Sequence, residues 1–410
     1  MTFFRSPLVR LTERAAGDRT FSVIKPLLAE KFGPLQGVRV ISSGVFIAQP
    51  FAAGLAAELG AEVIHVERPK VGDGYPVTRK GQERRNMLCV SLNLEKAAGC
   101  DLFLKLLAAA EIWFESSKPG TYQRFGLDDA TVLKANPRLV VVHVSGFGQY
   151  GDPAYVGQAS YDPIGQAFGG LMAHNGLPEP AAPSLLQPAA LSYLTSSFIM
   201  WSSLAALLHA RATGQGQAID IAMYEVAHKI LGGTMVEYFR NGHVRSRQDN
   251  QASGERFAGT FRCADGWIVI APLEDGARID AAIGARPRTA PTTAAADSQR
   301  RAYLGAWLAS RPCQEALRIL NGAGIACSKV MSAQDMAEDP YFQARAVDIQ
   351  WDDPEMGKVR GVGIVPKFSA TPGKIWRGAV GIGRDNQLVY RELLGLTDEQ
   401  LETLAGEGTI

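Results

Sequence analysis

Three basic residues come directly after segments with the composition of buried strands. Arg68 closes the segment EVIHVERP (62–69). Lys118 and Arg124 lie on either side of a Pro-Gly turn in SSKPGTYQRFG, which follows the strand-like EIWFES. Cations at the carboxyl ends of parallel strands suit an anionic ligand in the crevice of an open sheet, and arginine there suits a phosphate. Taken one at a time, these residues also fit a solvated basic turn and an arginine ending a strand in solvent.

The sequence lacks the motifs of several common kinds of functional site. No GxGxxG occurs in SSGVFIAQPFAAG, which argues against a dinucleotide although Glu67 closes the second strand. The six histidines form no HExxH or other clustered pattern, so no metal site is predicted, and no GxSxG marks a serine hydrolase. His65 and His143 fall within buried-strand patterns and are interpreted as core residues. The glycine-rich SGFGQYG (145–151) either approaches a ligand closely or turns the chain.

These residues are spaced along a repeating strand and helix pattern. GVRVISSG (37–44) predicts a strand, QPFAAGLAAELGA (49–61) a helix and residues 62–69 a second strand, which together form a βαβ unit. The pattern continues with a helix in DLFLKLLAAA, a strand in EIWFES, a helix in DDATVLKANP and a strand in RLVVVHVSGFG. We therefore expect an α/β fold with a doubly wound parallel sheet over residues 36 to about 150.

The second half of the chain predicts a smaller α+β domain. FRCADGWIVIAP indicates a strand pair around an Asp-Gly turn, and the low-complexity ARPRTAPTTAAADS a loop. The chain then returns toward the large domain, adding strands and one short C-terminal helix. The expected divisions are an N-terminal extension (1–35), a large domain (36–225), a small domain (226–330) and a returning segment (331–410).

Composition is that of an ordinary globular protein. Lys and Arg number 42 against 41 for Asp and Glu, so charge gives no reason to expect nucleic acid or a membrane as a partner. The five cysteines form no CxxC pair, which fits a reducing cytoplasm. The longest apolar run, residues 198–210, is shorter than the ~20 residues that span a bilayer and predicts a buried helix.

Several stretches, in the same order, resemble the family III CoA-transferases, the group that contains carnitine CoA-transferase and formyl-CoA transferase. They run from about residue 34 to 370 and are GVRVISSGVFIAQPFAAGLAAELGAEVIHVERPKVGD, SLNLEK, SSKPGTYQRFGL, NPRLVVVHVSGFGQYG, ASYDPIGQAFGGLM, LAALLHARATGQGQAIDIAMYE, GIACSKVMSAQDMAEDPYFQAR and VPKFSATPG. The resemblance implies a Rossmann-like large domain, a small domain and two chains interlocked as rings. It also implies coenzyme A or an acyl-CoA as substrate.

The same resemblance assigns residues to the CoA site. Arg68 matches an arginine near the adenine nucleotide end of CoA, and Lys118 and Arg124 match residues of the CoA-binding turn. The loop that lines the cofactor corresponds to Val45, Phe46, Ile47 and Ala48. CoA carries several anionic oxygens, which agrees with the phosphate-bearing ligand inferred from the basic residues.

One position departs from the family. Its chemistry resembles covalent catalysis by an aspartate, which forms an acyl anhydride and then a CoA thioester. In the family this aspartate stands about twelve residues before the stretch that begins here at Leu204. Ser192 occupies that position, and no Asp or Glu occurs between Glu179 and Asp220. Ser192 as an ester nucleophile would need an adjacent base. Glu179 and Asp162 are weak candidates for a carboxylate. Racemases of the family place a His-Asp pair around Asp162, but here a tyrosine replaces the histidine.

Three hypotheses follow. In the first, the chain is the non-catalytic subunit of a heteromeric CoA-transferase, and a paralogous partner carries the aspartate. Paired systems of this kind in the family act on aromatic and dicarboxylic acids, for example benzylsuccinate with succinyl-CoA as donor. In the second, the enzyme is homodimeric with a displaced carboxylate. In the third, the chain binds CoA esters as a scaffold or regulator without turnover.

Overall fold

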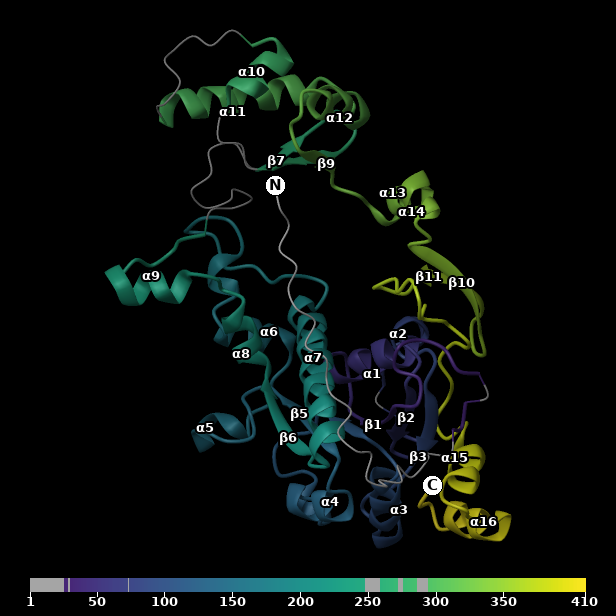
Figure 1. The fold of residues 1–410 in the computed structure, drawn as a ribbon. Coiled ribbons are helices and arrows are strands. Elements are labelled where there is room, and N and C mark those ends of the chain that lie inside the picture. Colours follow the sequence, from purple (N-terminus) through teal and green to yellow (C-terminus); the bar gives the residue numbers. More distant parts are fainter. Residues whose placement is uncertain (1–25, 29, 73, 248–258, 272–275, 286–293) are drawn as a thin grey trace, which may run out of the picture.

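A parallel six-stranded sheet forms the centre of the molecule (Figure 1). The computed structural model describes residues 26–410 except 29, 73, 248–258, 272–275 and 286–293. Along the sheet the order is β3-β2-β1-β4-β5-β6. The strands are β1 (Arg39–Ser43), β2 (Glu62–Glu67), β3 (Leu88–Ser91), β4 (Ile112–Glu115), β5 (Val140–Ser145) and β6 (Gln217–Ala222). The expected doubly wound sheet is confirmed, and β3 adds an edge strand that the pattern did not predict.

Strands β1 to β5 are buried along almost their whole length because helices cover both faces of the sheet, whereas the edge strand β6 is exposed over its first residues. Successive side chains point to opposite faces, so Val40 of β1 enters one core cluster and Ile41 enters the other. The first cluster packs against α1 (Ala48–Glu58) and α7 (Ala190–Thr213). The second packs against α3 (Ala97–Ala108) and α4 (Asp129–Ala135), together with the C-terminal helices.

Helix α7 contains the apolar run 198–210 but extends well beyond it, to 24 residues. Among the described helices, it alone is long and apolar enough to cross a membrane by length and composition. It packs against α1 and the sheet, with Leu191, Ile199 and Leu207 buried in the first cluster. The small side chains of α1, among them Ala52 and Ala53, are fully buried in the same cluster. The predicted helix is therefore confirmed, but it is buried only on the face toward α1 and the sheet, while Trp201 and Leu208 are exposed.

The C-terminal segment closes the large part of the molecule with two helices where one was predicted. They are α15 (Asn386–Glu392) and α16 (Asp398–Gly406). The Asp385 carboxylate accepts a hydrogen bond from the Cys89 amide at 2.7 Å, and the Tyr390 hydroxyl donates to the Ser91 carbonyl at 2.8 Å. The end of the chain therefore secures β3, the strand that the local pattern did not reveal.

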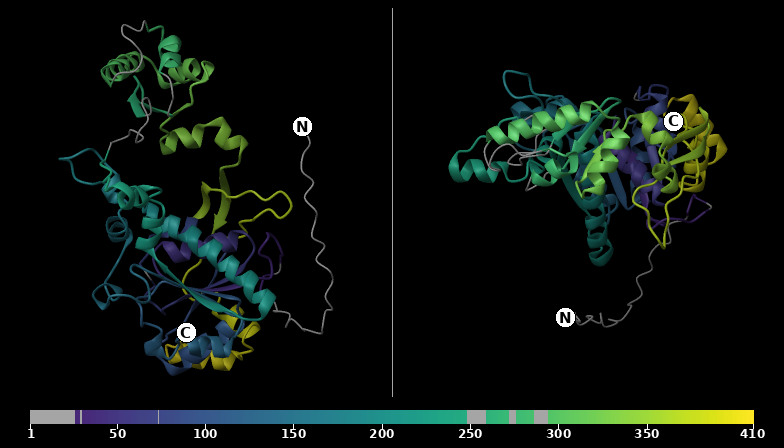
Figure 2. Two further views of the ribbon diagram at one scale, coloured as in Figure 1. Left: turned by 60° about the vertical axis from the view of Figure 1, so that its left-hand side comes forward. Right: turned by 90° about the horizontal axis from the view of Figure 1, so that it is seen from above.

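A second, three-stranded antiparallel sheet stands apart from the large one (Figures 1 and 2). The expected strand pair is confirmed, with the Asp-Gly turn between its strands. Its elements are β7 (Gly259–Arg262), β8 (Trp267–Ile270), β9 (Cys327–Lys329), α10 (Ala277–Ile283), α11 (Ala294–Ala309) and α12 (Cys313–Gly322), around a separate apolar core. Most of the predicted loop ARPRTAPTTAAADS lies outside the described residues, as do residues 1–25 of the expected N-terminal extension.

The chain reaches this sheet after α9 (Thr234–Asn241) and leaves it by a different route. The return runs through α13 (Ala333–Glu338), α14 (Pro340–Ala344) and the hairpin of β10 (Asp348–Asp353) and β11 (Gly357–Val362). Figure 1 shows α9 on the left of the molecule and α13, α14 and the β10–β11 hairpin on the right, so the described elements before and after the small sheet lie on opposite sides.

Candidate functional site

The sheet order places the topological switch point between β1 and β4, where open α/β sheets form their ligand-binding crevice. The connection after β1 leads through α1 to β2 on one side, whereas the connection after β4 leads through α4 to β5 on the other. Ligands of open α/β sheets bind where the strand order reverses in this way, outside the carboxyl ends of the strands. The two loops meet there, because the Val45 amide donates to Ser116 Oγ at 3.1 Å.

Close packing under this crevice explains a glycine. Gln49 of α1 is fully buried and donates from Nε2 to Ser42 Oγ at 3.0 Å. Ser42 Oγ also lies 2.8 Å from His65 Nδ1, which confirms His65 as a hydrogen-bonded core residue. A Cβ on Gly44 would lie 1.9 Å from Gln49 Oε1 and 2.6 Å from Ser116 Oγ. The loop after β1 can therefore approach β4 only with glycine at this position.

The loop of Val45, Phe46, Ile47 and Ala48 presents its first half to solvent. Val45 and Phe46 are exposed, whereas Ala48 begins α1 and is buried. Phe46 has a positive φ of 63°, and its carbonyl accepts a hydrogen bond from Arg84 Nη2 at 3.3 Å. The Ala48 carbonyl accepts from Ser196 Oγ of α7 at 2.6 Å. This loop thus joins the end of β1 to the first turns of α7.

The three predicted cations lie on the same edge of the sheet, on either side of β1. Arg68 follows β2, is exposed and pairs with Glu95 at 3.2 Å. Lys118 and Arg124 are exposed on the turn after β4, and within the described part of the chain neither has an ion-pair partner. An exposed ion pair such as that of Arg68 contributes at most about 1 kcal/mol, so a phosphate can displace Glu95 at little cost.

The turn that carries Lys118 and Arg124 is anchored from below. Tyr122 is buried, packs edge-on against Trp113 and donates its hydroxyl hydrogen bond to Ser43 Oγ at 2.7 Å. Glu115, the last residue of β4, accepts a hydrogen bond from the Ser117 amide at 2.6 Å. The exposed cations therefore project from a turn whose base is rigid.

A buried histidine completes this anchor. His143 Nδ1 lies 2.6 Å from Glu115 Oε1, and His143 Nε2 lies 2.9 Å from Asp129 Oδ1. Burial lowers the pKa of His143, but hydrogen bonds and charges from Asp129 and Glu115 outweigh it and raise the pKa to about 10. His143 is thus an imidazolium at neutral pH that links β4, β5 and α4, which confirms its interpretation as a core residue.

We expect the substitution His143→Gln to lower the free energy of unfolding, because it leaves buried Glu115 without its cation. Removing one partner of a buried pair costs about 3–5 kcal/mol. The pKa of about 10 lies above the ordinary value of 6.5. The stabilisation is therefore complete below pH ~6.5 and is lost as the pH rises toward 10, by at most ~1.4 kcal/mol per pH unit.

Urea unfolding of the wild type and the variant at pH 6, 7.5 and 9 measures this difference. His209→Gln, at an exposed position on α7, is the matched control and should change little. A difference between wild type and His143→Gln that grows with pH would contradict the assignment.

Ser192 lies in the first turn of α7 and is only 6% exposed. Its amide donates to Asp162 Oδ2 at 2.6 Å, and Asp162 Oδ1 accepts from Gln166 Nε2 at 2.5 Å. Asp162 begins α6 (Asp162–Phe168), so its carboxylate fastens α6 to the start of α7. Of the two weak carboxylate candidates, the structure brings Asp162 to position 192. Glu179 is exposed in the proline-rich loop and makes no hydrogen bond to described residues.

Sequence reasoning missed a carboxylate beside this turn. Glu83, at the end of α2 (Val77–Glu83), is buried and accepts hydrogen bonds at 2.5 Å from the hydroxyls of Tyr193 and Tyr75. Burial and the hydrogen bond to Glu83 raise the pKa of Tyr193 to about 12, so this phenol stays protonated. No local motif marks Glu83, because its partner Tyr193 stands 110 residues further along the chain.

The glycine-rich segment 145–151 packs against the chain itself. A Cβ on Gly146 would lie 2.0 Å from the Cβ of Ser160, and the Gln149 amide donates to Asp220 Oδ2 at 2.8 Å. Close packing thus accounts for Gly146, whereas Gly148 and Gly151 have positive φ angles of 89° and 132°, which favour glycine. Among the described residues, no group of three His, Cys, Asp or Glu side chains is placed to hold a metal ion.

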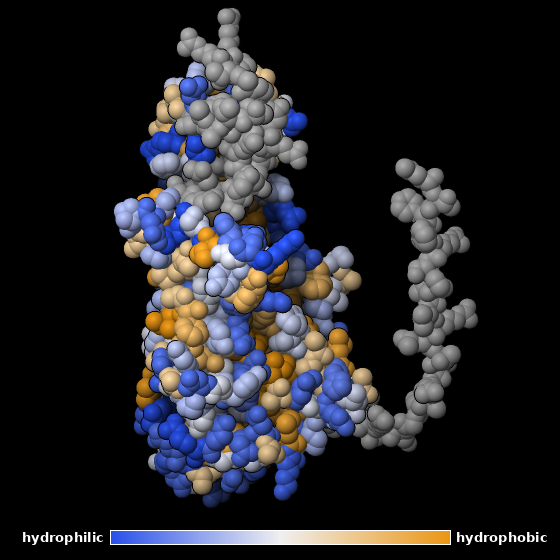
Figure 3. Space-filling model, turned by 90° about the vertical axis from the view of Figure 1, so that its left-hand side faces the viewer, coloured by the Kyte–Doolittle hydropathy of each residue, from blue (hydrophilic) through white to orange (hydrophobic). Residues whose placement is uncertain are grey.

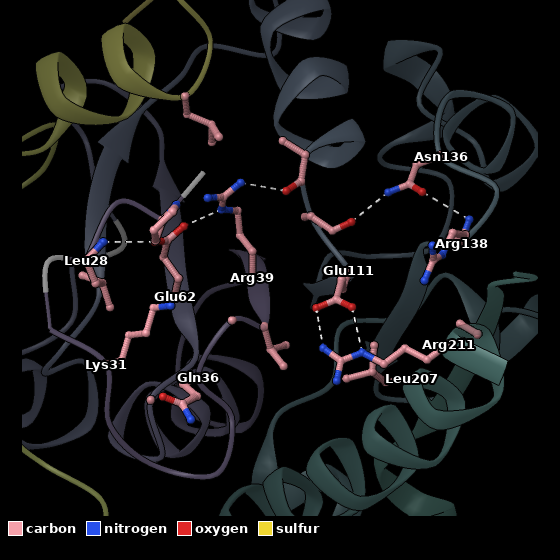
Figure 4. A pocket seen from close by; sticks show the side chains of 18 of the residues that line it. Leu28, Lys31, Gln36, Arg39, Glu62, Glu111, Asn136, Arg138, Leu207 and Arg211 are labelled. Atoms are coloured by element: carbon pink, nitrogen blue, oxygen red, sulfur yellow. Dashed lines mark hydrogen bonds and ion pairs between the residues drawn. The ribbon is translucent and has the colours of Figure 1, made fainter. Parts of the chain in front are cut away.

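A cavity of about 770 Å³ lies at the opposite edge of the sheet (Figure 4). Its charged walls are paired. Arg39 Nε donates to Glu62 Oε1 at 2.5 Å, and Arg211 makes two hydrogen bonds of 2.9 Å to Glu111. These residues surround the amino ends of β1, β2 and β4, away from the crevice at the switch point. This cavity is therefore not part of the candidate site.

Comparison with known proteins gives a consistent result. The sequence profile of CoA-transferase family III matches residues 35–386. A bile acid CoA-transferase of Clostridium scindens is 35% identical over 407 residues, which cover 92% of this chain and 90% of that protein. An L-carnitine CoA-transferase of Proteus mirabilis is 35% identical over 398 residues, covering 92% and 97% of the two chains.

Solved structures show the same fold. A CAIB/BAIF family protein from Brucella suis has a TM-score of 0.80 at 24% identity, covering 88% of this chain and all of that one. A protein from Mycobacterium tuberculosis has a TM-score of 0.72 at 21% identity, covering 87% and 99%.

Proposed function

Because this chain belongs to CoA-transferase family III, an enzyme family that moves CoA between an acyl-CoA and a carboxylic acid, we propose that it is one subunit of a heteromeric transferase. In this proposal it binds the CoA ester and supports the fold, while a paralogous partner supplies the aspartyl nucleophile. The isolated chain is then inactive. The observation that carries the proposal is Ser192, which occupies the buried first turn of α7 where the family register calls for aspartate.

The surroundings of Ser192 support this proposal. Residues 180–219 contain no Asp or Glu that could replace it from the same segment. Asp162 has both carboxylate oxygens engaged, one with the Ser192 amide and one with Gln166. A serine ester would also need a neighbouring general base, and no described histidine makes a hydrogen bond to Ser192.

For CoA binding, the support is the position of the cations. Lys118 and Arg124 present unpaired charge at the mouth of the crevice, and Arg68 offers a third cation on the far side of β1. In this arrangement the phosphates of CoA bind the cations, and the pantetheine arm runs past Val45, Phe46, Ile47 and Ala48 toward position 192.

Two features of this chain support pairing with a second chain: the arrangement of its elements and the apolar residues on its surface. The placement of α9 and of α13 and α14 on opposite sides of the molecule (Figure 1) suits two interlocked protomers, and we propose the domain limits given above as their structural units. Apolar side chains interrupt the polar surface in the space-filling view (Figure 3). Trp201 and Leu208 of α7 and Val236 and Phe239 of α9 are each more than half exposed. A partner chain would cover such residues.

Asp162 favours a second candidate, a homodimeric enzyme with a displaced nucleophile. Its carboxylate is the one that contacts residue 192 directly, at 2.6 Å from the amide nitrogen. In this alternative Asp162 would release the Ser192 amide and attack the thioester itself. The variant Asp162→Asn, which keeps an oxygen acceptor for that amide, would then abolish transfer.

Trapping with hydroxylamine and an acyl-CoA tests the proposal. An aspartyl enzyme is converted to a hydroxamate and inactivated, whereas this chain alone should keep its mass. Succinyl-CoA is the first donor, with aromatic and dicarboxylic acids as acceptors, as expected from the resemblance to paired transferases. A sterol acid and carnitine join the panel because of the relatives' substrates.

The expected result is transfer only when a paralogous chain with aspartate at the matching position is present. Normal transfer by the isolated chain would refute the subunit role. Binding of CoA esters with no transfer beside such a paralogue would favour a scaffold or regulator instead.

A further inference from the structure

Phe46 is held in an unfavourable backbone conformation that keeps its ring out of the core. Its φ of 63° is in the left-handed region, which costs a residue other than glycine about 1–3 kcal/mol. The nearly buried Arg84 fixes the Phe46 carbonyl by a hydrogen bond of 3.3 Å. Phe46 is 47% exposed. The fold therefore keeps an apolar residue at the surface in a backbone conformation that costs free energy.

A second aromatic ring meets it. Tyr161 is 55% exposed, and the two ring centroids lie 5.4 Å apart at an interplanar angle of 88°. This edge-to-face arrangement is the favourable geometry for an aromatic pair. Phe46 and Tyr161 come from the loop after β1 and from the residue that precedes α6, so the pair bridges two separate elements.

The segments that carry the two rings both bond to the start of α7. Tyr161 immediately precedes Asp162, whose carboxylate accepts a hydrogen bond from the Ser192 amide at 2.6 Å. Phe46 is two residues before Ala48, whose carbonyl accepts from Ser196, one turn further along α7, at 2.6 Å. The backbone next to each ring is therefore fixed to the first two turns of α7, which include position 192.

We propose that Phe46 and Tyr161 form an apolar wall that selects acyl groups bearing a ring, such as aryl or alicyclic acyl chains, over short acyl chains. The inference rests on the proposed CoA-ester site and specifies its substrate class. The loop 44–48 carries no charge, and both carboxylate oxygens of Asp162 are engaged by hydrogen bonds, so the wall presents apolar surface to the acyl group. A ring packed against two half-exposed rings removes apolar surface of all three from water.

Binding of CoA, acetyl-CoA and phenylacetyl-CoA to the purified full-length chain tests the wall without requiring turnover. We expect the wild type to bind phenylacetyl-CoA about tenfold more tightly than acetyl-CoA, the value of one aromatic contact. Phe46→Ala and Tyr161→Ala should each remove most of that preference, and Tyr161→Ala, which lies outside the loop of residues 45–48, should leave the affinity for CoA within about twofold. Tyr161→Phe keeps the ring and should retain the preference.

Tyr303→Ala is the matched control and should bind like the wild type. Tyr303 is an exposed tyrosine of α11, which packs against the small antiparallel sheet. Equal affinities of the wild type for acetyl-CoA and phenylacetyl-CoA, or an unchanged preference in the alanine variants, would refute the proposal that the two rings select the acyl group. Failure of the wild type to bind CoA itself would instead refute the proposed CoA-ester site. If Phe46→Ala does not fold, the comparison of Tyr161→Ala with Tyr161→Phe decides.

Discussion

Replacing Ser192 with aspartate is expected to give the isolated chain CoA-transferase activity. The new carboxylate would stand at the register position of the family nucleophile, on a turn already fixed by Asp162 and Ser196. Loss of the nucleophile in a covalent enzyme can lower kcat by about 10⁶-fold. Restoration of even a thousandth of full activity would therefore raise transfer by about 10³-fold over the wild-type chain.

The carboxylate of Asp162 lies close to the new aspartate and should affect its pKa. Two carboxylates close together raise the pKa of one of them, which would weaken the new nucleophile at neutral pH. Ser192→Asp combined with Asp162→Asn removes that repulsion and should be more active than Ser192→Asp alone.

Ser192→Asn is the matched control, because asparagine has the shape of aspartate without its nucleophilic oxygen. Hydroxylamine with donor acyl-CoA should modify the aspartate variants at residue 192 and leave the asparagine variant unmodified. If Ser192→Asp binds acyl-CoA but forms no covalent intermediate, the placement of the nucleophile at 192 is wrong.

The double substitution Lys118→Ala with Arg124→Ala is expected to weaken CoA binding by about 100-fold. Hydrogen bonds to charged groups contribute about 1.5–3 kcal/mol each, and 1.4 kcal/mol corresponds to a factor of ten in affinity. The turn should keep its shape in the variant, because Tyr122 and Glu115 anchor it from below. Arg68→Ala should have a smaller effect, since Arg68 must first leave Glu95.

Isothermal titration with CoA at low and high salt measures this effect. Added salt should weaken binding by the wild type more than by the double variant, because screening acts on the phosphate contacts. Lys134→Ala removes an exposed lysine of α4 outside the turn and is the control. An unchanged affinity in the double variant would show that the phosphates bind elsewhere.

Much of the fold follows from local pattern. The apolar segments at 37–44 and 62–69 predict β1 and β2 because parallel strands buried on both faces read as continuous apolar runs. β3 escaped prediction because it is only four residues long and depends on Asp385 and Tyr390, some 300 residues away, for its support. Of the two C-terminal helices only one was predicted; α16 begins with a capping box at Thr397, whereas α15 has no side-chain N-cap to mark its start.

Part of the candidate site likewise follows from the sequence, and part depends on the tertiary structure. By itself, the sequence determined which residues follow strands, namely Arg68, Lys118 and Arg124, and parallel strands necessarily bring their carboxyl ends to one edge. It also determined that position 192 carries no carboxylate. Only the tertiary structure decided that Asp162 fastens position 192, that Glu83 receives two phenols and that His143 lies between two carboxylates. These contacts join residues 8 to 110 positions apart, and side chains on different elements meet only when helices and loops pack on the finished sheet.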